Sequence, residues 1–127
     1  MRIDHVALTV RDLETARAFF TRYFGASAND GYHNPKTGLR TYFLTFETGA
    51  RLELMTRPQL APGGGAPYRA GYAHLAFALG SREAVDALTA CLAADGWTVQ
   101  SGPRVTGDGY YESCVLGPEG CLLELTA

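Results

Sequence analysis

The sequence predicts an α+β domain built from two tandem βαβββ modules. The main observation is an internal repeat: the segment HVALTVRDLETARAFF, which begins at His5, is echoed by HLAFALGSREAVDALTACL, which begins at His74. Each copy reads as a strand followed by an amphipathic helix. The modules also end on related sequences, RLELM after Ala50 and LLELT after Cys121. A stretch rich in proline and glycine separates the copies and indicates a linker.

These observations organise a chain of 127 residues, of which 46% are apolar, as one domain over 1–127. Module 1 is expected over about 1–56, the linker over about 57–70 and module 2 over about 71–127. A chain of this size buries enough apolar surface to fold without disulfides or a structural metal. Any metal site in it is therefore expected to serve function.

Each module carries the signals of one helix and one closing hairpin. Asp12 and Ser81 are N-cap residues that predict helices over 13–24 and 82–95, and each helix ends where a glycine follows. The hairpin of module 1 is expected to pair 39–47 with 50–55 around a Thr-Gly turn. In module 2, 110–116 pairs with 121–125 around a Gly-Pro-Glu-Gly turn.

Charge and composition exclude several classes of partner. Eleven basic and thirteen acidic residues give a formal charge of −2, with no run of either sign, so neither nucleic acid nor an anionic membrane is an expected partner. The first ten residues resemble neither a signal peptide nor a spanning helix, which predicts a cytoplasmic protein. Cys91, Cys114 and Cys121 lack C-x-x-C spacing and are interpreted as small apolar fillers.

The two histidines that open the repeat share a distinctive setting. Because side chains alternate across a strand, His5 lies on the same face as Ala7, and His74 on the same face as Ala76. The bulky residues of both strands point the other way, toward the expected helix. The face with the histidines therefore has small neighbours, and we expect it to line a pocket.

Glu53 and Glu124 each interrupt an apolar strand at matching positions of the two modules. A carboxylate buried on a sheet face requires a cation, which Arg51, Arg104 or a metal can supply. Because two imidazoles and two carboxylates recur in symmetric register, a divalent metal site is favoured over a hydrogen-bonded core cluster.

The predicted metal ligands are His5, Glu53, His74 and Glu124. A set of nitrogen and oxygen ligands without thiolate favours nickel, cobalt or zinc, with manganese or iron as alternatives. His33 lies beside Asn-Pro in a predicted loop and is given no role.

At this point the whole chain resembles the vicinal-oxygen-chelate superfamily, which includes glyoxalases, bleomycin resistance proteins and extradiol dioxygenases. The resemblance rests on DHVA with the helix LETARAFF and the following FG, on RLEL, on GYAHLAF and on GPEGCLLEL. It implies paired βαβββ modules that form an incomplete barrel around a metal.

Within the superfamily the ligand set looks most like the small bacterial type of glyoxalase I, or lactoylglutathione lyase. This implies a homodimer that binds a small-molecule substrate and uses all four residues as metal ligands. It also implies proton transfer in a methylglyoxal–glutathione hemithioacetal through a metal-bound enediolate. Glu124 is the implied catalytic base, and Glu53 is the second choice.

The sequence departs from the glutathione-using pattern in two places. Thr9 stands where those members carry an arginine, and Arg57 stands where they carry an asparagine. Since a lost arginine removes a charge-assisted contact to a glutathione carboxylate, the resemblance does not identify the thiol. The segment 107–112 has two open interpretations, as a lid or aromatic wall and as a turn followed by a half-exposed strand.

Three alternatives to a glyoxalase remain open. An extradiol dioxygenase binds ferrous iron with two histidines and one carboxylate, so Glu53 would not be needed as a ligand. An epimerase of acyl thioesters usually has an amide side chain at the position of Glu53. The third alternative is a metal-free protein that sequesters drugs, as in bleomycin resistance. Such a protein does not need four polar groups in an apolar binding pocket, so the complete ligand set argues against it.

Overall fold

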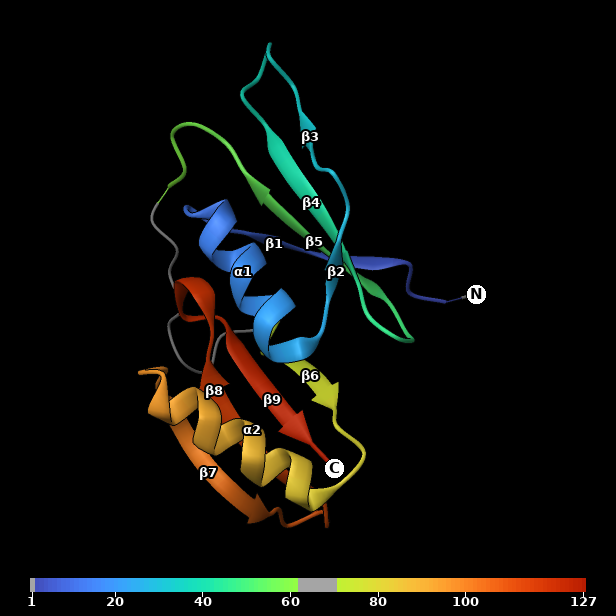
Figure 1. Cartoon of the computed structure of the whole chain (residues 1–127), viewed down its shortest axis with the longest axis vertical. Coiled ribbons are helices and arrows are strands. Elements are labelled where there is room, and N and C mark those ends of the chain that lie inside the picture. The colour runs from blue at the N-terminus through green and yellow to red at the C-terminus, as the bar shows by residue number, and fades with distance from the viewer. Residues whose placement is uncertain (1, 62–70) are drawn as a thin grey trace. The chain divides into compact units, whose positions relative to one another are not determined.

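The computed structural model describes residues 2–61 and 71–127 (Figure 1). The chain divides into two compact units, unit 1 over Met1–Gly63 and unit 2 over Gly64–Ala127. Each unit consists of one sheet with one longer helix on it, so the predicted α+β class with two tandem modules is confirmed. Most of the expected linker lies outside the described residues.

Unit 1 opens with a strand and a helix and then forms the rest of its sheet. Its elements are β1 (His5–Thr9), α1 (Leu13–Phe24), β2 (Ser27–Ala28), β3 (Tyr32–His33), β4 (Arg40–Thr45) and β5 (Arg51–Thr56). The strand order is β1-β5-β4-β2, and β3 also pairs with β4. Strands β1 and β5 are parallel, whereas β4 and β5 form the predicted antiparallel hairpin.

Unit 2 repeats this topology with one long strand where unit 1 has β2 and β3. Its elements are β6 (Leu75–Ala78), α2 (Arg82–Ala94), β7 (Val99–Val105), β8 (Tyr111–Leu116), a short 3-10 turn η1 (Pro118–Gly120) and β9 (Leu122–Thr126). The strand order is β6-β9-β8-β7, with β6 parallel to β9. The predicted strands differ from these by one or two residues at their ends, where the ladder gives way to turns.

Both helices begin where the capping residues predict. The Asp12 carboxylate accepts hydrogen bonds from the backbone N–H and the hydroxyl of Thr15, at 2.8 and 2.7 Å. The Ser81 hydroxyl accepts a hydrogen bond from Ala84 N at 3.1 Å. Helix α1 ends at Gly25, whose φ of 62° is in the left-handed region that glycine tolerates. The structure ends α2 at Ala94, one residue before the predicted end.

The core of each unit lies between its helix and one face of its sheet. Helix α1 covers the sheet of unit 1, and α2 covers β7, β8 and β9 (Figure 1). The largest fully buried side chains in these layers are Phe20, Leu44, Leu54, Leu92, Leu123 and Leu125. Burial alternates along β5 and β9, so Glu53 and Glu124 point to the face away from the helix. The sheet face opposite the core is therefore the one that carries the predicted ligands.

A tight turn sets the register between β8 and β9. The N–H of Gly117 donates to the carbonyl of Cys121 at 2.8 Å, and the N–H of Gly120 donates back to Gly117 at 3.0 Å. A Cβ atom at position 117 would lie 2.7 Å from the side chain of Leu123, so a larger residue there requires that buried leucine to shift. The turn thereby fixes which residues of the two strands face each other.

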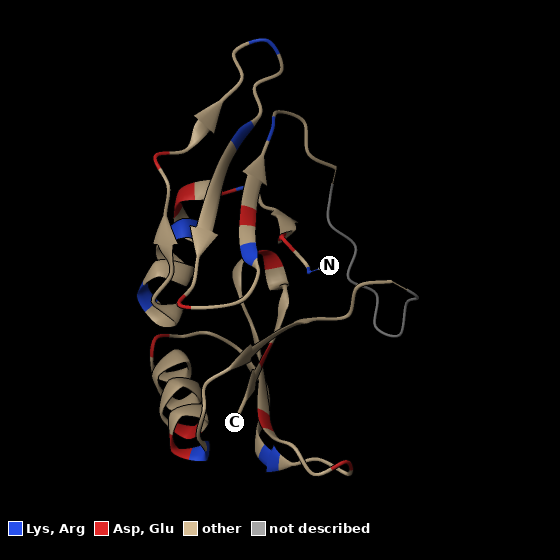
Figure 2. Cartoon of the chain, turned by 90° about the vertical axis from the view of Figure 1, so that its right-hand side faces the viewer, with Lys and Arg blue, Asp and Glu red and all other residues tan. Residues whose placement is uncertain are grey.

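Charged residues are distributed over both units without a block of one sign (Figure 2). This agrees with the small formal charge of −2 and with the absence of charge runs in the sequence. Among the described residues, no helix has the length and apolar character needed to cross a membrane.

Candidate functional site

Unit 1 brings His5 and Glu53 together on the sheet face opposite its core. The residues belong to the parallel strands β1 and β5, where Ala7 is the Cα partner of Glu53. His5 Nε2 lies 3.8 Å from Glu53 Oε2. The Glu53 side chain is only 17% exposed, whereas that of His5 is 40% exposed. The small side chain of Ala7 leaves room for this diagonal approach.

Unit 2 forms the same pair from His74 and Glu124. Here Ala76 is the Cα partner of Glu124, so the register repeats that of Ala7 and Glu53. His74 Nε2 lies 3.4 Å from Glu124 Oε2, and the two side chains are 39% and 19% exposed. The structure therefore brings the four predicted residues together as two equivalent pairs, one in each unit.

The pair in unit 2 has the spacing of two ligands of one divalent ion, and the pair in unit 1 is slightly wider. Ligand atoms at roughly 2.1 Å from an ion lie about 3.0 to 3.5 Å from each other at ordinary coordination angles. The separation in unit 2 falls in this range, and the separation in unit 1 exceeds it by a few tenths of an ångström.

A second carboxylate orients His5. Its Nδ1 donates to Asp4 Oδ2 at 3.0 Å, and because a carboxylate only accepts, the proton of the neutral ring resides on Nδ1. Nε2 then presents its lone pair toward Glu53. The hydrogen bond from His5, together with one from Arg51 at 2.5 Å, lowers the pKa of Asp4 to about 2.

Aromatic packing completes the surroundings of His5. Phe43 packs edge-on against the imidazole with the ring centroids 5.2 Å apart. The guanidinium of Arg51 lies over the Phe43 ring, 4.5 Å from its centroid. His5 of unit 1 therefore contacts both a carboxylate and an aromatic ring, and the carboxylate contact fixes the orientation of the imidazole.

The arginines predicted as alternative cations pair elsewhere. Arg51 forms its ion pair with Asp4, and Arg104 forms one with Glu112 at 3.0 Å. Among the residues that the structure describes, neither of these ion pairs involves Glu53 or Glu124. The arginines therefore do not supply the cation that Glu53 and Glu124 were expected to require.

Unit 2 also contains a group that the sequence interpretation missed. Glu112, Cys114 and Glu124 each offer one ligand atom, and these atoms lie within 4.8 Å of one another. Burial, followed by the charge of Glu112, raises the pKa of the Cys114 thiol. The signal was present as the alternation of Glu112 and Cys114 along one strand, but their proximity to Glu124 depends on the pairing of β8 with β9.

The interpretation of the cysteines as apolar fillers is corrected in part. Cys91 is exposed on α2, so it fills no core space. Cys114 lies among charged groups rather than apolar ones. Burial raises the pKa of the Cys121 thiol to about 11, so this half-buried cysteine comes nearest to the expected filler.

The segment 107–112 forms a turn that leads into a half-buried strand. Thr106 N donates to the carbonyl of Tyr110 at 2.8 Å, and its hydroxyl accepts from Tyr110 N at 3.0 Å. Tyr110 is exposed, and β8 begins at the next residue. The geometry matches the second of the two interpretations of this segment.

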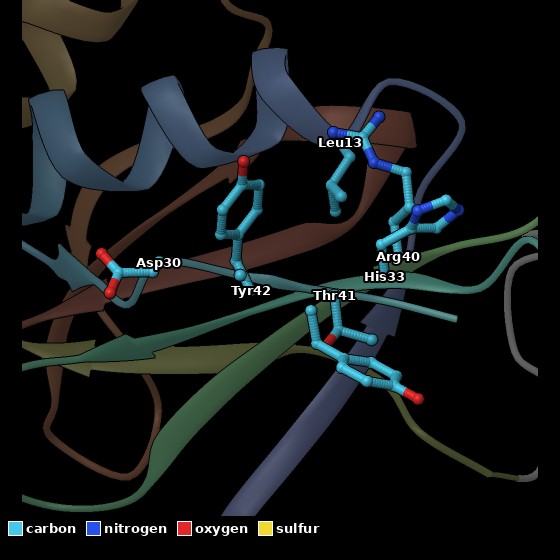
Figure 3. A pocket seen from close by; sticks show the side chains of 8 residues that line it. Leu13, Asp30, His33, Arg40, Thr41 and Tyr42 are labelled. Atoms are coloured by element: carbon cyan, nitrogen blue, oxygen red, sulfur yellow. The ribbon is translucent and has the colours of Figure 1, made fainter. Parts of the chain in front are cut away.

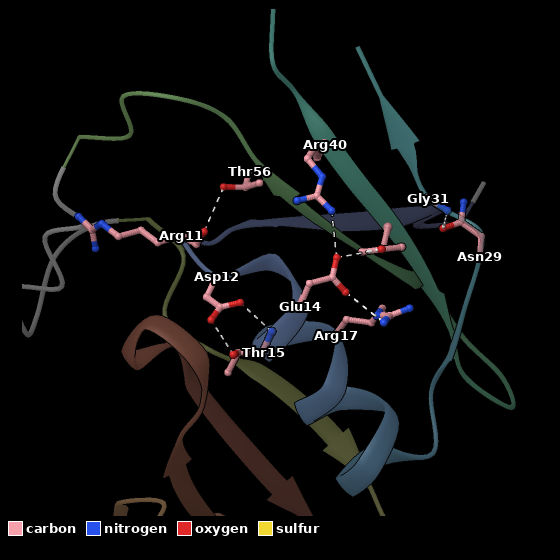
Figure 4. Close-up of polar contacts among 10 residues, drawn as sticks. Arg11, Asp12, Glu14, Thr15, Arg17, Asn29, Gly31, Arg40 and Thr56 are labelled. Atoms are coloured by element: carbon pink, nitrogen blue, oxygen red, sulfur yellow. Dashed lines mark hydrogen bonds and ion pairs between the residues drawn. The ribbon is translucent and has the colours of Figure 1, made fainter. Parts of the chain in front are cut away.

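A cavity of about 150 Å³ lies within unit 1, between α1 and strands β3 and β4 (Figure 3). Its lining consists of Leu13, Asp30, Gly31, Tyr32, His33, Arg40, Thr41 and Tyr42, and includes none of the four predicted ligands. Glu14 accepts hydrogen bonds from Arg40 at 3.0 Å and from Tyr42 at 2.9 Å, and pairs with Arg17 (Figure 4). These contacts pair Arg40 with a carboxylate and attach α1 to β4.

Comparison with known proteins gives the following matches. The sequence model of the Glyoxalase/Bleomycin resistance protein/Dioxygenase superfamily matches residues 2–125. A structure described as a possible glyoxalase from Bacillus cereus is 28% identical with a TM-score of 0.72, covering 100% of this chain and 99% of that chain. A glyoxalase family protein from Enterococcus faecalis is 24% identical with a TM-score of 0.81, covering 99% and 97%.

Glyoxalase I from Zea mays is 21% identical with a TM-score of 0.79, and the match covers 98% of this chain. The chain spans only 44% of that longer protein. Likenesses below 25% identity show the fold alone. Comparison with curated proteins finds no match.

Proposed function

Because the chain belongs to the Glyoxalase/Bleomycin resistance protein/Dioxygenase superfamily, we propose that it is a divalent-metal-dependent lyase or isomerase of the glyoxalase I type. The observation that carries the proposal is the pair of His–Glu contacts in equivalent register, His5 with Glu53 and His74 with Glu124. A duplicated fold has no structural need to keep such a pair in both copies.

The proposed metal ligands are these four residues, with nickel, cobalt or zinc as the favoured ion. A bound divalent ion supplies Lewis-acid chemistry, which acidifies a C–H bond next to the substrate oxygens. Glu124 then accepts the proton from one carbon and returns it to the adjacent carbon, and Glu53 is the second choice for this role. Both carboxylates are less than one-fifth exposed, which limits exchange of that proton with water.

The proposed substrate is a small oxygenated compound such as a hemithioacetal of methylglyoxal with a thiol. Thr9 lies on the same face of β1 as His5 and carries no positive charge for a glutathione carboxylate. We therefore expect the thiol preference to differ from that of glutathione-using members. We further propose that the protein acts in the cytoplasm as a homodimer.

Metal analysis tests the proposal. Protein purified without a tag is stripped and reconstituted with nickel, cobalt, zinc, manganese and iron, alongside Glu53→Ala and His74→Ala. We expect near-stoichiometric metal at the four-residue site in the wild type, loss of that one equivalent in both variants, and turnover of methylglyoxal hemithioacetals by the nickel or cobalt form. Failure to bind any metal would contradict the proposal and favour ligand sequestration, and cleavage of catechols by the iron form would favour a dioxygenase.

Asp4→Ala is expected to weaken metal binding by about tenfold, since the carboxylate that orients a metal-ligating histidine contributes this much to affinity. Without Asp4, the imidazole of His5 is free to rotate and its Nδ1 loses its acceptor. The dissociation constant is measured by competition with a chromophoric chelator. Asp30→Ala removes an exposed carboxylate of the same unit and serves as the control. Equal affinities for the two variants would remove the positioning role from Asp4.

A further inference from the structure

The His74–Glu124 pair of unit 2 has a neighbour that the pair of unit 1 lacks. Cys114 is the direct Cα partner of Glu124 across the antiparallel strands β8 and β9. Glu112 lies two residues before Cys114, so its side chain is on the same face of the sheet. One ligand atom from each of the three residues lies within 4.8 Å of the other two.

We propose that Glu112, Cys114 and Glu124 form a binding site for a thiophilic divalent ion such as Zn²⁺ or Co²⁺. A thiolate between two carboxylates favours these ions over Mn²⁺ and Mg²⁺, which prefer oxygen ligands alone. The site lies wholly within unit 2. It shares Glu124 with the proposed catalytic set but does not rest on that set.

The structure already places a cation against this group. Arg104 Nη2 donates to Glu112 Oε1 at 3.0 Å. The Arg104 side chain is 44% exposed, whereas that of Glu112 is only 12% exposed. The guanidinium of Arg104 can therefore rotate into solvent. The carboxylate of Glu112 then stays in place and can bind an incoming ion.

Unit 1 provides an internal comparison for this site. Phe43 is the Cα partner of Glu53, as Cys114 is of Glu124. Thr41 occupies the position two residues earlier, where unit 2 has Glu112. Because unit 1 has an aromatic ring and a hydroxyl at these places, the thiol and the second carboxylate are specific to unit 2 and do not follow from the repeated fold.

Binding at this site exchanges one set of bonds for another. The S–H bond of Cys114 breaks, its proton goes to water, and the sulfur lone pair forms the bond to the ion. The ion releases water molecules as the oxygens of Glu112 and Glu124 replace them. The ion does not change its oxidation state.

Cobalt spectroscopy tests the site directly, since a Co²⁺–thiolate bond gives an intense near-ultraviolet charge-transfer band. Under reducing, anaerobic conditions we expect Co²⁺ to produce this band in the wild-type chain and not in Cys114→Ser. Cys91→Ser and Cys121→Ser are matched controls that should keep it. Absence of the band from the wild type, or its survival in Cys114→Ser, would overturn the proposal.

Two further variants separate this site from the catalytic set. The double variant His5→Ala/Glu53→Ala should keep the charge-transfer band, because unit 2 holds the ion by itself. Loss of the band in this variant would contradict the proposed site and would leave the catalytic proposal unaffected. Glu112→Gln should keep the band but weaken Co²⁺ binding by at least about tenfold. Loss of an outer-shell partner already costs this much affinity, and a direct ligand should cost no less. Unchanged binding in Glu112→Gln would exclude this residue as a ligand and overturn the three-residue site.

Discussion

Glu124→Gln is expected to lower kcat for a methylglyoxal hemithioacetal by about 10²- to 10⁴-fold, the usual contribution of a general base. The amide has the same size as the carboxylate and keeps an oxygen directed toward His74, but it cannot accept the proton from carbon. His5, His74 and Glu53 are unchanged. We therefore expect the variant to retain most of its metal and to show a loss in kcat rather than a rise in KM.

The measurement is steady-state turnover with metal content determined on the same samples. Glu119→Gln changes an exposed glutamate in the neighbouring turn and should leave turnover unchanged. Glu53→Gln identifies the base by comparison, since the larger loss in kcat marks the residue that moves the proton. Full activity in Glu124→Gln would remove Glu124 from the catalytic role.

Phe20→Ala is expected to reduce the free energy of unfolding by about 3 to 5 kcal/mol, the range for truncating a buried phenylalanine. Phe20 is 0% exposed in the layer between α1 and its sheet, and its ring packs edge-on against Phe19 at 5.2 Å. Since domains of this kind have a total stability of about 5 to 15 kcal/mol, the loss is a large fraction of what holds unit 1 together.

Urea unfolding followed by circular dichroism measures this loss as a shift of the midpoint at constant slope. Ala18→Gln lies on the exposed side of the same helix and should change stability by less than about 0.5 kcal/mol. A loss below about 1 kcal/mol in Phe20→Ala would show that the surrounding side chains refill the space.

The elements most accurately predicted from the sequence are those with local signals. Helix α1 spans the predicted residues because Asp12 caps its start and Gly25 ends it, and both act within one turn. The His–Glu pairs were predictable for another reason. The internal repeat has a histidine and a glutamate at matching positions of both modules, so the role inferred for a residue in one module is supported by its equivalent in the other.

The parts that were missed depend on pairing between strands. Whether Cys114 faces Glu124 is decided by the register of β8 on β9, and no periodicity along either strand contains that information. The partners of Arg51 and Arg104 were open for the same reason. Asp4 lies near Arg51, and Glu112 lies near Arg104, because the pairing of neighbouring strands brings them together.

The turn at Gly117 has a consequence for how chains of this fold can vary in length. Inserting or deleting one residue between β8 and β9 slips the register, and a slip of one residue sends alternate side chains to opposite faces. Glu124 would then enter the core and Leu123 or Leu125 would take its place. We therefore expect the exposed hairpin around Asp108 to tolerate insertions better than the turn before β9, because the position of a carboxylate depends on the length of that turn.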